Sequence, residues 1–472
     1  MLQLLSPSLV AALLVGSGPT VHTAHTLLSR PFDELAAAAG PDGARHIWRL
    51  LRNGDDPEDA WSADTVAEVT GLGQRRRAEV LEAHTPLRDI AQLTHATVAA
   101  DGTRKLLLRL RDGLEVETVV IPPLPTSGAA SARARTTVCI SSQVGCRMGC
   151  AFCATGRMGL LRDLTVDEIL VQAHFARAAA STAGLPPLSN AVFMGMGEPA
   201  ENAPRVRAAV RCLTDSHRFG FSQQSVVVST VAPSVGSFGA LLEGWEGGQG
   251  PMLAWSLHAA DEALRKQLVP TATASPTELR DALADALLRR DPRRRRILVE
   301  YCLIAGVNDG VVDAELLHEF LLPLNEACHD PQRDSKRTGV LVNLIPYNPG
   351  LEYNPGLESP HHQRAADRED APAATAASAV NGEEGDGAVV CAEAVGEAVG
   401  AAATRGGRIP HHSHFKRPSW SSVDAFQAKL RELGTWTSVR SARGDDTASA
   451  CGQLATSTQL KRQAQAGHAG GA

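Results

Sequence analysis

Short apolar runs alternate with amphipathic stretches over residues 122–350 of this 472-residue chain. This alternation is typical of buried strands joined by crossover helices, which together form a parallel sheet. Six runs fit such strands: Thr137–Ser141, Asn190–Met194, Ser225–Ser229, Met252–Ser256, Arg296–Leu303 and Val340–Ile345. Helical stretches lie between them, among them Thr165–Ala180, Pro204–Ser216, Glu278–Arg290 and Ala314–Leu322. The pattern predicts an α/β fold with a curved, partial (β/α)6 barrel.

The residues before the barrel follow a different pattern. Residues 33–94 show the apolar spacing of helices, whereas Lys105–Arg111 and Leu114–Ile121 alternate around a turn, as in a hairpin. We therefore predict a small N-terminal helical domain plus hairpin over residues 33–121. Residues 1–32 contain no acidic residue and one basic residue, Arg30. This composition resembles a transit peptide, and it predicts a plastid or mitochondrial protein; an ordinary N-terminal helix or tail would instead leave the protein cytoplasmic.

The chain beyond the barrel divides into three parts. Residues 351–410 are dominated by Ala, Gly, Glu and Asp, so they cannot bury a core, and we predict a disordered, low-complexity insertion. Residues 411–456 regain a helical stretch from Ser422 to Leu433 and a strand near Trp436–Arg440, and they complete the catalytic domain. Residues 457–472 are expected to form a polar tail.

The net charge of −6 is unevenly distributed. Glu358–Thr404 holds nine acidic residues and two arginines, so the rest of the chain carries about +1. Basic clusters at Arg75–Arg77, Arg289–Arg296 and Lys416–Arg417 could meet the phosphates of a nucleic acid, although each could also be an ordinary solvated surface. No apolar run is long enough to span a bilayer, so we expect no membrane partner.

Three cysteines, Cys146, Cys150 and Cys153, stand in a CxxxCxxC spacing. Their thiolates can bind one face of an iron–sulfur cube, and because such clusters normally take four cysteines, one iron stays open to a small molecule. A zinc site is the alternative, but structural zinc usually needs a second cysteine pair, and the sequence contains none. His174 and His217 are too isolated to complete one. The spacing therefore favours a cluster over zinc.

Polar residues follow the predicted strands at their carboxyl ends, where barrels carry out their chemistry. Gly197 and Glu198 follow the second strand and offer backbone groups and a carboxylate to an ammonium group. Hydroxyl, imidazole and amide groups suited to ribose, carboxylate and adenine occur at Ser229, Ser256, His258 and Asn343. Turns and hydrogen-bonded core residues would explain any one of these, but their recurrence predicts a shared site.

Two further cysteines differ in their surroundings. Cys451 lies in a polar Gly/Asp/Ser loop that offers a structural cysteine little packing. Cys139 lies in the strand before the cysteine loop, where a buried core cysteine is the simpler interpretation from spacing alone. The remaining cysteines, Cys302 among them, have no comparable context and are interpreted as structural.

With these motifs, the chain resembles the RlmN/Cfr-type radical S-adenosylmethionine (SAM) family of ribosomal RNA adenine-C2 methyltransferases. The resemblance runs from about Leu114 to Leu454, interrupted by the insertion. Its most specific segments are Val138–Cys153, Met194–Pro199, Ser256–Ala259, Asn343–Pro349 and Gly444–Leu454. CxxxCxxC alone would indicate only a radical SAM enzyme, and the last segment narrows the resemblance to this family.

The resemblance implies a [4Fe-4S] cluster on Cys146, Cys150 and Cys153, with SAM on the open iron. The positions that match SAM contacts are Gly197, Glu198, Ser229, Ser256, Leu257, His258 and Asn343. Cys451 matches the cysteine that accepts a methyl group, Cys139 the thiol that resolves a covalent enzyme–RNA adduct, and Glu117 the proposed proton acceptor. The implied partners are rRNA, with tRNA as a second candidate, and an electron donor such as a flavodoxin or ferredoxin; we expect a monomer.

Two other classes of function stay open at the sequence level. One is a radical SAM enzyme that acts on a small molecule or a protein, which would not need Cys451 as a methyl carrier. The other is a non-catalytic RNA-binding assembly factor, which would bind rRNA without consuming SAM.

Overall fold

The computed structural model describes eight stretches: residues 26–60, 73–124, 134–245, 250–329, 339–349, 414–441, 443–447 and 449–454. The predicted insertion at 351–410, the predicted tail at 457–472 and residues 1–25 of the predicted leader lie outside them. Within the described residues, no helix is long and apolar enough to cross a membrane.

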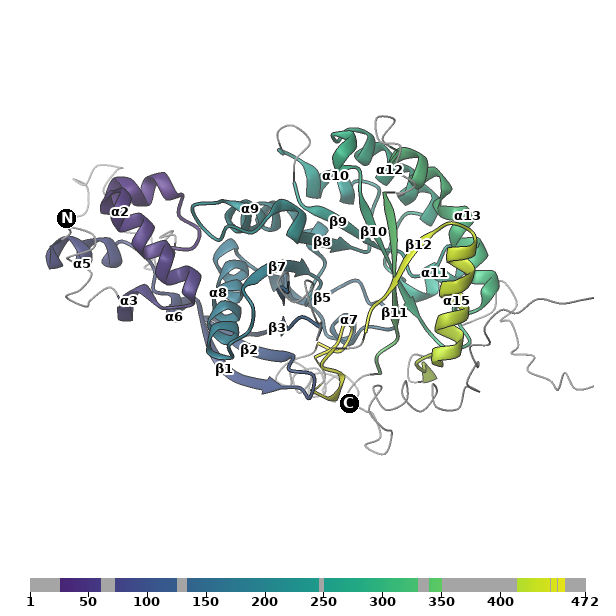
Figure 1. Cartoon of the computed structure of the whole chain (residues 1–472), viewed down its shortest axis with the longest axis horizontal. Helices are drawn as coiled ribbons and strands as arrows, with labels where there is room; N and C mark the ends of the chain where they lie inside the picture. Colours follow the sequence, from purple (N-terminus) through teal and green to yellow (C-terminus); the bar gives the residue numbers. More distant parts are fainter. Residues whose placement is uncertain are drawn as a thin grey trace, which may run out of the picture.

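A parallel sheet forms the centre of the protein (Figure 1). All six predicted strands are present and neighbour one another in chain order: β4 (Thr136–Cys139), β7 (Leu188–Phe193), β8 (Val226–Thr230), β9 (Met252–Ser256), β10 (Ile297–Leu303) and β11 (Val340–Pro346). A further strand, β12 (Trp436–Val439), pairs in parallel with β11. The prediction of a partial barrel is confirmed, and β12, the strand predicted near Trp436–Arg440, joins the barrel sheet beside the six.

Helices cover the outer face of this sheet (Figure 1). They are α8 (Val166–Thr182), α9 (Ala203–Thr214), α10 (Ser237–Leu242), α11 (Glu262–Leu268), α12 (Pro276–Leu288), α13 (Val311–Ala327) and α15 (Trp420–Glu432). Capping residues mark where two of these helices begin. Thr165 forms a capping box with Glu168 at the start of α8, and Ser275 forms one with Glu278 at the start of α12; both satisfy free N–H groups of the first turn. Strands that are covered on one face and line a barrel on the other must be apolar nearly throughout, as these are.

Three antiparallel strands extend the sheet at its other edge. They are β1 (Ala91–Val98), β2 (Arg104–Leu110) and β3 (Glu115–Ile121), and β3 pairs with β4. The predicted hairpin is therefore continuous with the barrel sheet. The helical prediction extended to Thr94, but β1 occupies that segment, because pairing with β2 overrides the spacing of its mostly exposed side chains.

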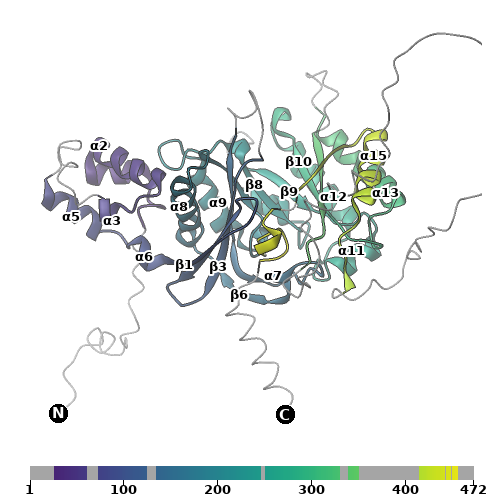
Figure 2. The ribbon, with the colours of Figure 1, turned by 60° about the horizontal axis from the view of Figure 1, so that its bottom comes forward.

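The N-terminal helices form a separate group at the end of the molecule, next to α8 and β1 (Figures 1 and 2). They are α2 (Phe32–Asn53), α3 (Pro57–Ala60), α5 (Gln74–Glu82) and α6 (Leu87–Ile90). Leu27 and Leu28 are buried in the same core, and the Thr26 hydroxyl donates to Asp167 of α8. Residues 26–28 of the segment predicted as a leader are thus part of the folded body.

Candidate functional site

The three clustered cysteines lie on one loop at the mouth of the barrel. Cys146 ends β5 (Gln143–Cys146), which pairs with β6 (Gly159–Asp163), and Cys153 directly precedes α7 (Ala154–Arg157). The loop is anchored to the end of α11 and the residues after it: the Ala151 N–H donates to the Leu268 carbonyl at 3.0 Å, and the Thr271 hydroxyl donates to the Met148 carbonyl at 2.7 Å. Fixed backbone anchors hold the three thiols in place.

The chemistry of this trio fits a metal cluster better than a single ion. Burial raises the pKa of Cys146 and of Cys150, so these thiols become thiolates only beside a strong positive centre. Among the described residues, no group of three His, Cys, Asp or Glu side chains is close enough to hold one metal ion. A cube holds its thiolates at separate corners, farther apart than the ligands of one zinc, and three soft sulfur donors leave its fourth corner open.

A cavity of about 890 Å³, including its mouth, opens beside the trio, and we call it the cluster cavity. The ends of five neighbouring strands, β7 to β11, line it, together with the C-terminal loop (residues 443–454). The lining includes Cys146, Cys150, Cys153, Gly197, Glu198, Ser229, Ser256, His258, Glu300, Cys302, Asn348 and Cys451. The structure thus brings together the cysteine trio and most of the predicted SAM-contacting residues.

Glu198 is held rigidly at one side of the cluster cavity. Its two carboxylate oxygens accept hydrogen bonds from the N–H groups of Ala200, at 2.9 Å, and Val231, at 3.0 Å. Burial raises its pKa to about 7, although these hydrogen bonds act in the opposite direction. Gly197 has φ +100°, and a Cβ there would lie 2.6 Å from Cβ of Gln143, so only glycine fits.

A row of polar residues crosses strands β9 to β12 of the barrel sheet. Ser256 pairs with Glu300, Glu300 with Asn343, and Asn343 with Ser438, on four neighbouring strands. The Ser229 hydroxyl lies 3.0 Å from that of Ser256 and donates to Glu300 at 3.3 Å. Asn343 itself does not line the cluster cavity among the described residues; its Oδ1 accepts from Ser438 at 3.1 Å.

His258 lines the cluster cavity in a fixed tautomer. Its Nδ1 accepts the Cys302 N–H at 3.0 Å, so the ring proton of the neutral imidazole lies on Nε2. Burial lowers its pKa to about 3, which keeps the ring neutral. Its φ of +63° is unusual for a residue with a side chain. Leu257 is buried beside it and is not among the described lining residues; its N–H donates to the Glu300 carbonyl.

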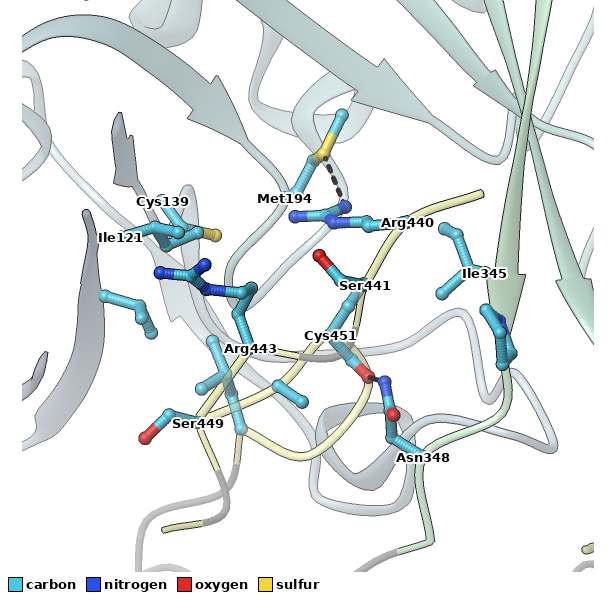
Figure 3. Close-up of a pocket in the computed structure, with 14 residues that line it drawn as sticks. Ile121, Cys139, Met194, Ile345, Asn348, Arg440, Ser441, Arg443, Ser449 and Cys451 are labelled. Atoms are coloured by element: carbon cyan, nitrogen blue, oxygen red, sulfur yellow. Dashed lines mark hydrogen bonds between the residues drawn. The ribbon is translucent and has the colours of Figure 1, made fainter. Parts of the chain in front are cut away.

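A second cavity, of about 480 Å³, adjoins the first, and we call it the thiol cavity (Figure 3). It lies between the ends of β3, β4, β7, β11 and β12 and the C-terminal loop. Its lining includes Val119, Ile121, Cys139, Met194, Ile345, Asn348, Arg440, Ser441, Arg443 and Cys451. Cys451 lines both cavities, so it forms part of the wall between them.

Hydrogen bonds fix the C-terminal loop onto the cysteine loop, and Figures 1 and 2 show this loop in yellow beside α7. The Ala154 N–H donates to the Gly452 carbonyl at 2.7 Å, and the Thr155 hydroxyl donates to the Leu454 carbonyl at 2.6 Å. The Asn348 amide donates to the Cys451 carbonyl at 3.2 Å. Cys451 is thereby held against the trio, although about 300 residues separate them in the chain.

Both thiols of the thiol cavity are protonated at neutral pH. Burial raises the pKa of Cys451 to about 11 and that of Cys139 to about 12, and the positive charge of Arg440 opposes both shifts. Arg440 is therefore close enough to both sulfurs to favour their thiolate forms.

Glu117 lies on β3, one of the strands whose ends line the thiol cavity. It is on β3 on the same face as Val119 and Ile121, which line the cavity, but its carboxylate forms a buried ion pair with Lys105 of β2 at 3.0 Å. Among the described lining residues of the two cavities, Glu117 is absent.

Three residues of the site were missed at the sequence level. Glu300 is a lone acid within the apolar run Arg296–Leu303, a signal that could have identified it. Cys302 was interpreted as structural, but it lines the cluster cavity. Arg440 stands at the end of a predicted strand, and only the folded arrangement shows that it lies in the thiol cavity.

Comparisons with known proteins agree with this site. No family model matches the chain. The "Probable RNA methyltransferase sce1580" of Sorangium cellulosum is 34% identical over 86% of this chain and 78% of its own. The "Probable dual-specificity RNA methyltransferase RlmN" of Nostoc punctiforme is 33% identical over 83% of both chains. The "Dual-specificity RNA methyltransferase RlmN" of a Caulobacter species is 31% identical over 84% and 77%.

The solved structures include a similar protein. The crystal structure of a radical SAM methyltransferase from Sphaerobacter thermophilus superposes with a TM-score of 0.62 and is 29% identical, covering 91% of this chain and 99% of its own. Both the length of the matches and their identities exceed what a shared barrel alone would give. The chain belongs to the RlmN family of radical SAM RNA methyltransferases.

Proposed function

We propose that this protein methylates C2 of an adenine in large-subunit rRNA, and of an adenine in tRNA, through a methylated Cys451. The observation that carries the proposal is the position of Cys451 on the wall between the cluster cavity and the thiol cavity. A methyl carrier must face the methyl donor on one side and the RNA base on the other. Family membership supports RNA as the substrate.

Adenine C2 is electron-poor and does not attack a methyl group as a nucleophile, so a radical route is needed. When bound, a [4Fe-4S] cluster with SAM supplies the electron, the methyl group and a radical that abstracts hydrogen. Cys146, Cys150 and Cys153 would hold the cluster, because their thiols lie on one loop of the cluster cavity, beside the predicted SAM contacts.

The remaining groups of the cluster cavity orient SAM. Glu198 offers a carboxylate to the amino group, and Gly195 and Gly197 let the backbone approach closely. The Ser229 and Ser256 hydroxyls and the Glu300 carboxylate, which are already hydrogen-bonded together, suit ribose hydroxyls. His258 offers a neutral Nε2–H donor. These groups are arranged before ligand binds, which lowers the cost of ordering them.

The thiols perform the transfer. Cys451 loses its proton, and its sulfur takes the methyl group. After a hydrogen atom is removed, the methylene radical on Cys451 adds to adenine C2 and links RNA to protein. The adduct then loses the C2 proton and one electron, which a bound cluster would accept. Cys139, in the same cavity, attacks the Cys451 sulfur as a thiolate, so that a disulfide forms, the bond from that sulfur to the methylene carbon breaks, and the released carbon takes up a proton to become the methyl group. Glu117 would accept the C2 proton once its ion pair with Lys105 opens toward the cavity.

The proposal also covers the RNA substrate, the electron donor and the compartment of the protein. The target adenine must leave its stack to reach the thiol cavity, so an unstacked RNA segment is the substrate. A flavodoxin or ferredoxin would deliver the electron, and the protein would act as a monomer. We place it in a plastid or mitochondrion if the acid-free segment before Thr26 acts as a leader, and otherwise in the cytoplasm.

Anaerobic reconstitution with iron and sulfide tests the proposal. The loaded protein should show the broad visible absorption of a thiolate-bound cluster and should convert one adenine of protein-free rRNA to 2-methyladenine, detected by nuclease digestion and mass spectrometry. Intact mass should also show one added methyl group on Cys451. Bound zinc, or RNA methylation that persists in Cys451→Ala, would reject it.

A further inference from the structure

Two guanidinium groups line the thiol cavity, and they differ in how they are bound. Arg443 is anchored by two contacts: its Nε forms an ion pair with Oδ2 of Asp101 at 2.9 Å, and its Nη2 donates to the Pro122 carbonyl at 3.0 Å. Arg440 has one weak contact, from Nη1 to Sδ of Met194 at 3.5 Å, drawn in Figure 3. Arg443 thus serves the structure of the cavity, whereas Arg440 keeps donors available.

The acidic partner of Arg440 leaves those donors free. Oε1 of Glu300 lies 3.8 Å from Nη1 of Arg440, which is an ion pair without a hydrogen bond. Within the described part of the chain, Nε and Nη2 of Arg440 have no hydrogen-bond partner. Its side chain is 24% exposed, so these donors can be reached from the cavity.

The position of Arg440 is fixed relative to both reactive sulfurs. Its backbone N–H donates to the Leu344 carbonyl at 2.8 Å, which holds the residue at the end of β12. Arg440 lines the same cavity as Cys139 and Cys451, and its positive charge acts to lower the pKa of both thiols. The target carbon must approach the Cys451 sulfur, and the adduct must lie within reach of Cys139. A base placed this way comes close to the guanidinium.

Adenine has two ring nitrogens, N1 and N3, bonded to C2, and both are hydrogen-bond acceptors. A guanidinium has five donors and no acceptor. We propose that Arg440 contacts the target adenine and donates a hydrogen bond to one of the two ring nitrogens that flank C2. This assignment rests on the proposed function and adds to it a group that recognises and activates the base.

The hydrogen bond would act on the step in which carbon adds to carbon. An alkyl-type radical adds fastest to an electron-poor carbon, and a cationic donor at the neighbouring nitrogen withdraws electron density from C2. It also stabilises the charge that builds up on that nitrogen as the bond forms. No proton is transferred, so the reaction's balance is unchanged. Arg440 is in this sense a catalytic residue.

The test combines changes in protein and base. Wild type and Arg440→Gln, each reconstituted and methylated on Cys451, react in a single turnover with RNA carrying adenosine, 1-deazaadenosine or 3-deazaadenosine at the target position. Removal of the contacted nitrogen should slow wild type about tenfold more than it slows Arg440→Gln, because the variant has already lost the charged hydrogen bond. The other deaza analogue should slow both proteins equally.

Two further variants keep the result interpretable. Arg443→Gln removes a charge from the same cavity but should keep the wild-type sensitivity to the deaza analogues. Arg440→Lys keeps a charged donor and should recover part of that sensitivity. If both analogues slow wild type and Arg440→Gln by the same factors, the inference is wrong, and Arg440 binds a phosphate or serves only Glu300. If wild type methylates neither Cys451 nor adenosine, the proposed function fails instead.

Discussion

The cluster cavity and the thiol cavity share a wall, but they are built in different ways. The cluster cavity is lined by strand ends of the barrel, and its polar groups already bind one another, as in the Ser229–Ser256–Glu300 set and the Glu198 carboxylate. The thiol cavity forms where the ends of five strands meet the C-terminal loop, and it contains protonated thiols and an arginine with free donors.

This difference matches the two tasks of the protein. A small cofactor is bound by rigid, preorganised groups, and barrel strands supply them. A base that arrives from RNA and becomes covalently attached needs reactive groups that are not yet engaged. Cys451 lines both cavities, as the proposed passage of the methyl group from one to the other requires.

Removing the shared thiol should have the largest effect. Cys451→Ala leaves the cluster cavity intact but removes the methyl carrier, so we expect loss of RNA methylation by more than about a thousandfold. Visible absorption of the reconstituted protein should be retained. Cys328→Ala, a buried cysteine outside both described linings, is the control and should keep activity. Retained methylation in Cys451→Ala would mean that the two cavities do not communicate through this residue.

The next prediction concerns the backbone of the cluster cavity. In Gly197→Ala, a Cβ would lie 2.7 Å from the Gln143 backbone nitrogen at a φ of +100°, so we expect the free energy of unfolding to fall by about 3 kcal/mol. Gly184→Ala is a matched control, because Gly184 also has positive φ (+62°) but open space around it. It should cost about 1 kcal/mol. Urea titration measures both, and equal losses would show that the close approach to Gln143 is unimportant.

The thiol cavity should respond to a rise of pH above neutrality through Cys451. With a pKa of about 11, Cys451 is mostly protonated at neutral pH, and its thiolate fraction rises with pH. The rate of Cys451 methylation should therefore increase about tenfold per pH unit above neutrality, as followed by intact mass. Arg440→Gln should lower this rate at every pH, because the guanidinium favours the thiolate. A flat profile would show that deprotonation is not part of the measured step.

The same contrast explains what the sequence could reveal. The six strands, the cysteine trio and the polar strand ends follow local rules, so periodicity and spacing located the cluster cavity. The thiol cavity depends on contacts between residues far apart, such as Arg440 with Glu300 and Met194, and no local pattern encodes them. Cys139 is an example: spacing alone indicated a core cysteine, and only the resemblance indicated a reactive one.

Two features of strands β1 to β3, at the edge of the sheet, could not be predicted from the sequence either. β1 has mostly exposed side chains, so its apolar spacing carried little information, and its pairing with β2 decided its structure. The placement of Glu117 in an ion pair with Lys105 likewise depends on the register of β2 and β3. These features follow from tertiary pairing and not from propensity.

The smallest expected effect concerns the junction that joins the two cavities. The Thr155 hydroxyl donates to the Leu454 carbonyl, so Thr155→Val removes one buried hydrogen bond between the cysteine loop and the C-terminal loop, worth about 1 kcal/mol. The loop that carries Cys451 should open about fivefold more often. Limited proteolysis should then cut residues 443–454 faster, and Cys451 methylation should slow by a similar factor.

Thr271→Val provides the matched control for this junction. It removes the hydrogen bond from Thr271 to the Met148 carbonyl, which fixes the cysteine loop on its other side and does not involve the C-terminal loop. Its proteolysis at residues 443–454 should equal that of wild type. If both variants expose these residues equally, the C-terminal loop responds to general loosening of the cysteine loop. Protection that differs between them shows that the Thr155 contact itself couples the cluster to the methyl-carrying thiol.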